Sequence, residues 1–169
     1  MLSILNEEGV FSLPNVTNVG NESFYRDFQF ALNADRDLNE LRINGNVQKI
    51  GISAFLRGSY VIKSTNNLDS EISEFNEVTE IGANAFQLMT KNQNLRFSSK
   101  LESVGSGAFI SQNNSINIYI NRTQALTFVQ PDSFGESGSN VTIYVPANSE
   151  LYTQLTASGM ACRNRVMTF

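Results

Sequence analysis

A short pattern recurs five times along the chain, and it limits the possible fold more than any other feature of the sequence. Each copy reads aliphatic residue, two variable residues, Val or Ile, Gly, two variable residues, Ala or Ser, and Phe. A unit this short cannot bury its own apolar residues, but stacked copies can share one continuous core. The pattern therefore predicts a repeat protein. The copies are Val16–Phe24, Val47–Phe55, Val78–Phe86, Leu101–Phe109 and Leu126–Phe134, whose phenylalanines stand 31, 31, 23 and 25 residues apart.

Each fixed position of the pattern has a physical interpretation. The phenylalanines are expected to stack in one buried column, because equivalent positions of successive coils lie above one another. The glycine indicates either a turn with positive φ or a close backbone approach that a Cβ would block. The last copy departs from the rule, with Gln130 in the glycine position, followed by Pro131. The predicted core column is Phe24, Phe55, Phe86, Phe109 and Phe134.

Short runs of alternating apolar and polar residues lie between the copies and predict half-buried strands. Four runs are clear: Leu41–Ile43, Leu95–Phe97, Ile116–Ile120 and Val141–Val145. The strand before the third copy is ambiguous, since it reads either as Ile72–Phe75 or as an earlier start at Tyr60–Ile62. The extra residues of the two long units are expected in loops, at Asp35–Asp37 and Ser64–Asn67, which have turn-forming composition.

The whole chain, residues 1–169, is predicted to form a single domain, because its length suits one domain of ordinary size. Residues 1–15 are expected to cap the first coil, residues 16–145 to form the repeats and residues 146–169 to cap the last coil. Within the C-terminal cap, Asn148 or Ser149 is expected to begin a short helix that runs to about Ala157. Val166–Phe169 is expected to form a final strand.

Composition excludes several classes of chemistry. The chain has no His, no Trp and one Cys, so Ser–His or Cys–His catalysis, His-ligated metals and internal disulfides are excluded. We therefore expect no enzyme activity, no metal and no cofactor. Lone Cys162 is interpreted as a small apolar filler. The net charge of −4 and the lack of basic runs argue against nucleic acid, and no apolar run is long enough for membrane insertion.

The repeat resembles the BspA-like, or Treponema-type, leucine-rich repeat. The residues that carry this resemblance are Leu95-x-Phe97, then Leu101-x-x-Val104-Gly105-x-x-Ala108-Phe109, and Val141-x-Ile-x-Val145-Pro146 followed by Tyr152. It covers roughly residues 13–155. The resemblance implies a right-handed leucine-rich-repeat solenoid of about five to six coils, mainly β with short helical turns and terminal caps. Family members are mostly adhesins and other non-catalytic surface proteins.

The resemblance suggests an extracellular or cell-surface location, but the start of the chain shows no signal peptide. Residues 1–15 lack a basic n-region and a continuous apolar run. Either the protein is not exported by a signal peptide, or Met1 begins a piece of a longer protein. The location therefore stays open.

The outward-facing residues of the strands form the candidate ligand-binding surface. If the apolar residues of each alternating run point inward, their neighbours share one outer sheet face. Arg and Tyr are typical of binding hot spots, although Tyr and Thr also favour strands on an ordinary sheet face. We expect a binding or adhesion module for a protein or glycan; the alternative is a structural or assembly component, such as a virion or fibre spacer. The candidate residues are Arg42, Arg96, Asn117, Tyr119, Thr142 and Tyr144.

Overall fold

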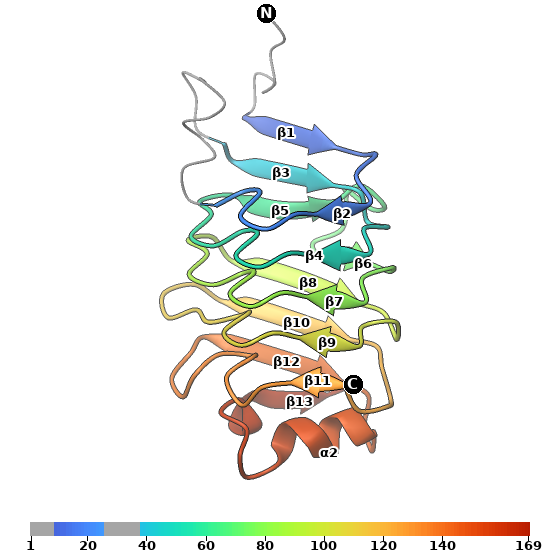
Figure 1. Cartoon of the computed structure of the whole chain (residues 1–169), viewed down its shortest axis with the longest axis vertical. Coiled ribbons are helices and arrows are strands. Elements are labelled where there is room, and N and C mark those ends of the chain that lie inside the picture. The colour runs from blue at the N-terminus through green and yellow to red at the C-terminus, as the bar shows by residue number, and fades with distance from the viewer. Residues whose placement is uncertain (1–8, 26–37) are drawn as a thin grey trace, which may run out of the picture.

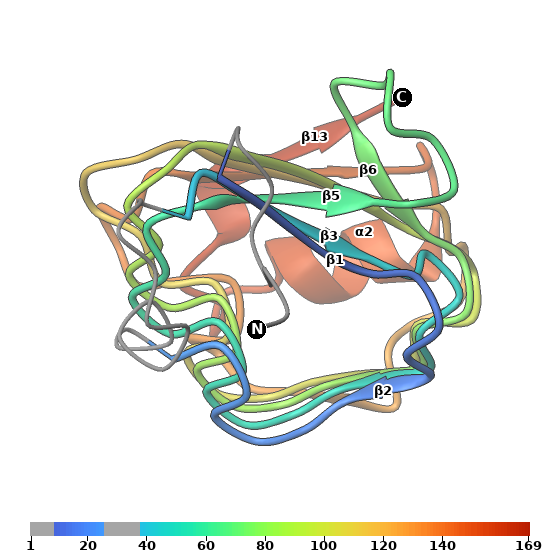
Figure 2. The ribbon, with the colours of Figure 1, turned by 90° about the horizontal axis from the view of Figure 1, so that it is seen from above.

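The chain winds into a solenoid of about six coils, one above another (Figure 1). This computed structural model describes residues 9–25 and 38–169; the predicted Asp35–Asp37 loop and residues 1–8 of the predicted N-terminal cap lie outside them. Seen from the N-terminal end, the path runs clockwise as it moves away from the viewer, which is right-handed winding (Figure 2). Little of the described part of the chain is helical, as predicted. We number the coils by their motif phenylalanine, from coil 1 (Phe24) to coil 5 (Phe134).

Longer parallel strands form one wall of the solenoid, and each predicted alternating run lies in one of them. Their burial alternates between buried and half-buried residues, because successive side chains of a strand point to opposite faces. The wall consists of two sheets. The first contains β1 (Val10–Leu13), β3 (Glu40–Ile43) and β5 (Val61–Ser64), and the second contains β6 (Ser73–Phe75), β8 (Gln93–Phe97), β10 (Ile116–Ile120), β12 (Val141–Val145) and β13 (Val166–Thr168).

Two-residue strands form the opposite wall, which Figure 2 shows across the coil from β1, β3 and β5. Each contains the Val or Ile that precedes the glycine position of the motif, and that residue is buried in all copies but the last. All neighbours are parallel, as stacking of like positions requires. The strands are β2 (Asn18–Val19), β4 (Lys49–Ile50), β7 (Glu80–Ile81), β9 (Ser103–Val104) and β11 (Phe128–Val129).

The five motif phenylalanines lie one above another inside the solenoid. Their successive ring centroids are 5.7, 5.0, 5.0 and 5.7 Å apart, and every ring is buried. Phe97 of β8 contacts Phe109 edge to face at 6.3 Å, which connects the column to the long-strand wall. The rings thus form the continuous core that no single unit could bury alone.

The motif glycines allow two coils to approach each other, and they do not adopt positive φ. A Cβ on Gly105 would lie 2.4 Å from the backbone nitrogen of Ala83 in the coil above, and one on Gly82 would lie 2.5 Å from that of Ile52. Of the two interpretations of the glycine, the close approach is correct. Positive φ occurs two residues later in the motif, at Glu22, Ser53, Asn84 and Gly107.

Both candidates for the ambiguous strand exist, because the third unit contributes β5 and also β6. Ser64 is the last residue of β5, so the predicted loop at Ser64–Asn67 begins one residue later than expected. The two sheets meet here through the buried side chain of Gln93. Its Oε1 accepts from the Ile62 N–H at 3.1 Å, and its Nε2 donates to the Tyr60 carbonyl at 3.0 Å. The Ser73 Oγ of β6 also donates to the Ile62 carbonyl at 2.9 Å. Side chains thus replace the missing strand-to-strand hydrogen bonds.

A short helix closes the C-terminal end of the core. Ser149 is the N-cap of α2 (Glu150–Thr156), and its Oγ accepts from the Tyr152 N–H at 3.0 Å. Leu151 and Leu155 of this helix are buried against the last coil, and Figure 1 shows α2 across the end of the solenoid. A 3-10 turn, η1 (Arg163–Arg165), leads into β13, which matches the predicted final strand.

Candidate binding face

A row of side chains crosses the outer face of the second long-strand sheet at one register. Glu74 of β6 pairs in register with Arg96 of β8, Arg96 with Tyr119 of β10, Tyr119 with Tyr144 of β12, and Tyr144 with Met167 of β13. Each position lies between two inward-facing residues of its strand, except in β13, so parallel pairing aligns all five side chains on the outer face. We call Glu74, Arg96, Tyr119, Tyr144 and Met167 the ladder.

The ladder residues contact one another in sequence. Arg96 Nη1 lies 2.9 Å from Glu74 Oε1, and the two side chains remain 42% and 29% exposed. The Arg96 Cζ lies 5.5 Å from the centroid of the Tyr119 ring, within cation–π range. The Tyr119 and Tyr144 rings stack at 4.6 Å with an interplanar angle of 10°. The outer face therefore presents one ordered stack of a carboxylate, a guanidinium and two phenols.

A second, neutral row lies two residues before the ladder. Asn117 of β10 pairs in register with Asn94 of β8 and with Thr142 of β12. The Asn117 Nδ2 donates to Asn94 Oδ1 at 2.8 Å, which fixes both amides along the row. The stack of the ladder is thus flanked by an amide pair and a hydroxyl.

The structure brings five of the six predicted binding residues together and separates the sixth. Arg42 lies on β3, in the other sheet, where its register partners are Ser12 and Lys63. Its Nε forms an ion pair with Glu40 Oε1 of its own strand at 2.5 Å. Arg42 therefore does not continue the ladder.

Sequence reasoning missed three members of these rows, namely Glu74, Asn94 and Met167. The alternation in Ile72–Phe75 and in Val166–Phe169 contained the signal for Glu74 and Met167. The strand of Asn94 was expected to start at Leu95, whereas β8 begins at Gln93. Register could not be assigned before the strand bounds were known.

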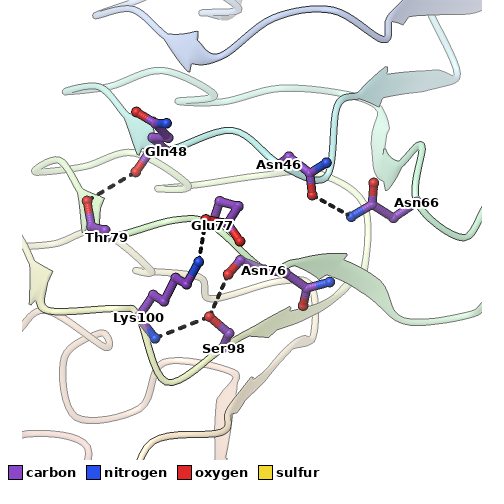
Figure 3. A network of polar contacts seen from close by, with 8 residues as sticks. All are labelled: Asn46, Gln48, Asn66, Asn76, Glu77, Thr79, Ser98 and Lys100. Carbon is purple, nitrogen blue, oxygen red and sulfur yellow. Dashed lines mark hydrogen bonds and ion pairs between the residues drawn. The ribbon is translucent and has the colours of Figure 1, made fainter.

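A further polar network connects successive coils at the bends that follow the long strands (Figure 3). Lys100 Nζ lies 2.5 Å from Glu77 Oε2, and Ser98 Oγ donates to the Asn76 carbonyl at 2.7 Å. Asn66 Nδ2 donates to Asn46 Oδ1 at 3.2 Å. These contacts stabilise the stacking of the coils.

The described part of the chain holds few residues that could act as a nucleophile or bind a metal ion. Burial raises the pKa of the Cys162 thiol, and this buried group donates to the Leu155 carbonyl, as expected for a packing residue. Residues 9–25 and 38–169 contain no group of three or more His, Cys, Asp or Glu placed to hold a metal ion. Among the same residues, no helix has the length and apolar character needed to cross a bilayer.

Comparison with known proteins identifies the repeat. No curated protein and no solved structure matches the chain. Six copies of the BspA type leucine rich repeat region match residues 17–156, which is most of the sequence. The matched range contains all five motif phenylalanines and the strands from β2 to β12. The chain therefore belongs to the BspA-type leucine-rich-repeat family.

Proposed function

We propose that this chain is a non-catalytic binding module that contacts a protein partner through the ladder, in the manner of a cell-surface adhesin. The family supports a repeat protein of the kind often used in protein–protein interaction. The observation that carries the proposal is the continuous stack from Glu74 to Tyr144 on an exposed sheet face. Arg and Tyr are the residue types enriched at the energetic centres of interfaces.

The order of the ladder supports tight recognition. Its side chains project from parallel strands that pair on both sides in β8, β10 and β12. Stacking and the ion pair further limit the rotamers of Arg96, Tyr119 and Tyr144. A partner that binds these residues therefore freezes few additional side chains, and each immobilised side chain otherwise costs about 0.5–1.5 kcal/mol.

The stacking geometry favours a protein over a glycan at this face. Sugars bind aromatic residues through the flat face of the ring, but both faces of Tyr119 are covered, one by Arg96 and the other by Tyr144. The second face of Tyr144 turns toward β13, where Met167 is its register partner. Ring edges and phenol hydroxyls remain for a partner, and these suit the backbone amides and side chains of a polypeptide.

A binding screen of the purified chain against matrix proteins and glycans tests this function. Surface plasmon resonance should detect a protein partner whose affinity falls at least about tenfold in Tyr119→Ala or Tyr144→Ala, since hot-spot truncation costs about 1–2 kcal/mol or more. Phe128→Ala is the matched control, because Phe128 is 50% exposed on the opposite wall. Equal loss in all three variants, or no loss in the tyrosine variants, would refute the assignment of this face.

One observation favours a second candidate, a structural or assembly role. β13 is the terminal strand of its sheet. Met167 within this strand is 53% exposed, and Phe169 directly after it is 60% exposed. Terminal strands with apolar side chains tend to pair with another chain. Analytical ultracentrifugation tests this role: concentration-dependent association that Met167→Lys abolishes supports assembly, and a monomer at all concentrations contradicts it.

A further inference from the structure

We propose that a groove at one edge of the solenoid binds a sugar that carries a carboxylate. The groove has a volume of about 350 Å³, within the usual range of about 300–1,000 Å³ for small-molecule sites. Its lining comes from Arg57 of coil 2, Leu88–Thr90 of coil 3 and Ser111–Asn114 of coil 4. None of these residues belongs to the ladder, so this site is independent of the proposed protein-binding face.

The groove is held in shape by hydrogen bonds between coils. The N–H of Arg57 donates to the Gln87 carbonyl at 2.9 Å, and that of Leu88 donates to the Ile110 carbonyl at 2.8 Å. At the far side, Asn114 Nδ2 donates to the Met89 carbonyl at 3.3 Å. A ligand would therefore meet a preformed surface, which reduces the entropy lost on binding.

Two lining residues adopt a backbone conformation that their side chains disfavour. Arg57 has φ 59° and Leu88 has φ 55°, and both stand two residues after a motif phenylalanine. In coil 5 the positive φ falls one residue earlier, at Gly135 directly after the motif phenylalanine, with φ 87°, a conformation that glycine adopts without strain. Retaining Arg and Leu costs about 1 kcal/mol or more at each position. Strain of this kind clusters at binding sites.

Some polar side chains of the groove have no partner within the described residues, and the groove carries a positive charge at Arg57. The side chains of Arg57, Gln112 and Asn113 make no hydrogen bond or ion pair within the described chain, and all three residues are exposed. No Asp or Glu occurs in residues 41–68, 81–101 or 103–131, the stretches from which the lining comes, although the net charge of the chain is −4. Arg57 is therefore available to an external anion.

The combination of groups selects the ligand class. A guanidinium pairs well with a carboxylate through two hydrogen bonds. The amides of Gln112 and Asn113 can each donate to and accept from hydroxyl groups. Leu88 supplies an apolar surface beside them, which suits the C–H face of a sugar ring. A carboxylated saccharide has all three features, whereas an acidic peptide lacks the ring and the hydroxyls.

Titration followed by ¹H–¹⁵N NMR tests the site, with a tetrasaccharide of alternating glucuronate and N-acetylglucosamine as the probe. We expect the amides of Arg57, Leu88 and Gln112 to shift on addition. Chitotetraose, which shares the N-acetylglucosamine but lacks the carboxylate, should bind at least about tenfold more weakly, because hydrogen bonds to charged groups are the stronger ones. A tetraglutamate peptide should leave these amides unchanged.

Two variants separate binding from structure. Arg57→Gly should weaken binding of the glucuronate probe by about tenfold or more. The same variant should have a higher melting temperature, because glycine relieves the strain at φ 59°. Arg163→Gln removes one positive charge from η1 and should bind as wild type does. The proposal fails if Arg57→Gly binds normally, if no groove amide shifts, or if tetraglutamate binds as well as the saccharide.

Discussion

The backbone N–H of Gln130 donates to the Ser133 hydroxyl at 2.8 Å, and that hydroxyl donates onward to the Val104 carbonyl at 2.9 Å. In the preceding coil the motif glycine bonds its upper neighbour directly, since the Gly105 N–H reaches the Ile81 carbonyl at 2.8 Å. The Ser133 hydroxyl lies between the two backbone groups and so increases the distance between coil 5 and coil 4 at this point. The Cβ of Gln130 then fits where every other copy has glycine.

Replacing Ser133 with alanine should therefore destabilise the solenoid. Ser133 is fully buried, so removing its hydroxyl leaves a part-buried N–H and a buried carbonyl without this partner, which costs about 1–3 kcal/mol. Urea unfolding monitored by circular dichroism measures the change. Ser23→Ala is the control, because Ser23 holds the same motif position but donates only to Gly20 of its own coil. Equal losses in the two variants would contradict the bridging role.

Alanine at a motif glycine should destabilise the solenoid inside the stack and have almost no effect at its start. In Gly105→Ala the new Cβ meets backbone atoms of the coil above, at 2.4 Å from the Ala83 nitrogen, and overpacking of this kind costs about 1–3 kcal/mol or more. In Gly20→Ala it meets only the Ser23 hydroxyl at 3.1 Å, so stability should change by less than about 0.5 kcal/mol. Differential scanning calorimetry of both variants checks this difference.

Much of the fold follows from the repeat pattern, because stacked equivalent positions must bury the same residue types. The pattern did not decide between two roles for the motif glycine, since a close approach depends on the coil above and not on the local sequence. The third unit was ambiguous for a similar reason. Tyr60–Ile62 and Ile72–Phe75 both alternate, and only tertiary pairing shows that each forms a strand.

Alkaline pH should weaken the fold through Tyr60. Burial raises the pKa of the Tyr60 phenol above its ordinary value, and its hydroxyl donates to the Phe24 carbonyl. The folded state therefore resists ionisation while the unfolded chain ionises near pH 10. The contribution of Tyr60 to the free energy of unfolding is therefore fully present below that pH and is lost above it. The loss is about 1.4 kcal/mol between about pH 9 and pH 11.

Urea unfolding of wild type and Tyr60→Phe at both pH values isolates this contribution. The variant lacks the phenol hydroxyl, so it should be less stable than wild type at pH 9 and lose less stability on going to pH 11. An identical pH dependence in the two proteins would exclude Tyr60 as its source.

The C-terminal cap should depend on Arg165. The Arg165 guanidinium donates to the carbonyls of Phe134 at 3.2 Å, Gly135 at 3.0 Å and Val141 at 3.0 Å, and so joins η1 to coil 5. A lysine ammonium cannot reach these oxygens together, so Arg165→Lys should cost about 1–3 kcal/mol. Hydrogen exchange of residues 134–141 should accelerate, whereas Arg163→Lys should leave it unchanged.

The candidate face was harder to predict than the fold. Alternation places Arg42 and Arg96 on outer faces of the same wall, but a shared ladder also requires continuous pairing between their strands. That pairing stops between β5 and β6, where the third unit contributes two strands. Arg42 is therefore separated from the ladder by an insertion. The local sequence pattern does not show how this insertion interrupts the pairing of the strands.

The ladder should contribute to stability as well as to binding, because its aromatic members contact each other. Stacked aromatic pairs add about 0.5–1.5 kcal/mol beyond the area that they bury, so a double-mutant cycle with Tyr119→Ala and Tyr144→Ala should give a coupling energy in that range. A cycle of Arg42→Ala with Tyr119→Ala should give a coupling near zero, since Arg42 lies in the other sheet. Urea unfolding of the single and double variants provides both values. Zero coupling between the tyrosines would mean that the rings do not stack in solution, and the ring-face argument for a protein partner would then fail with it.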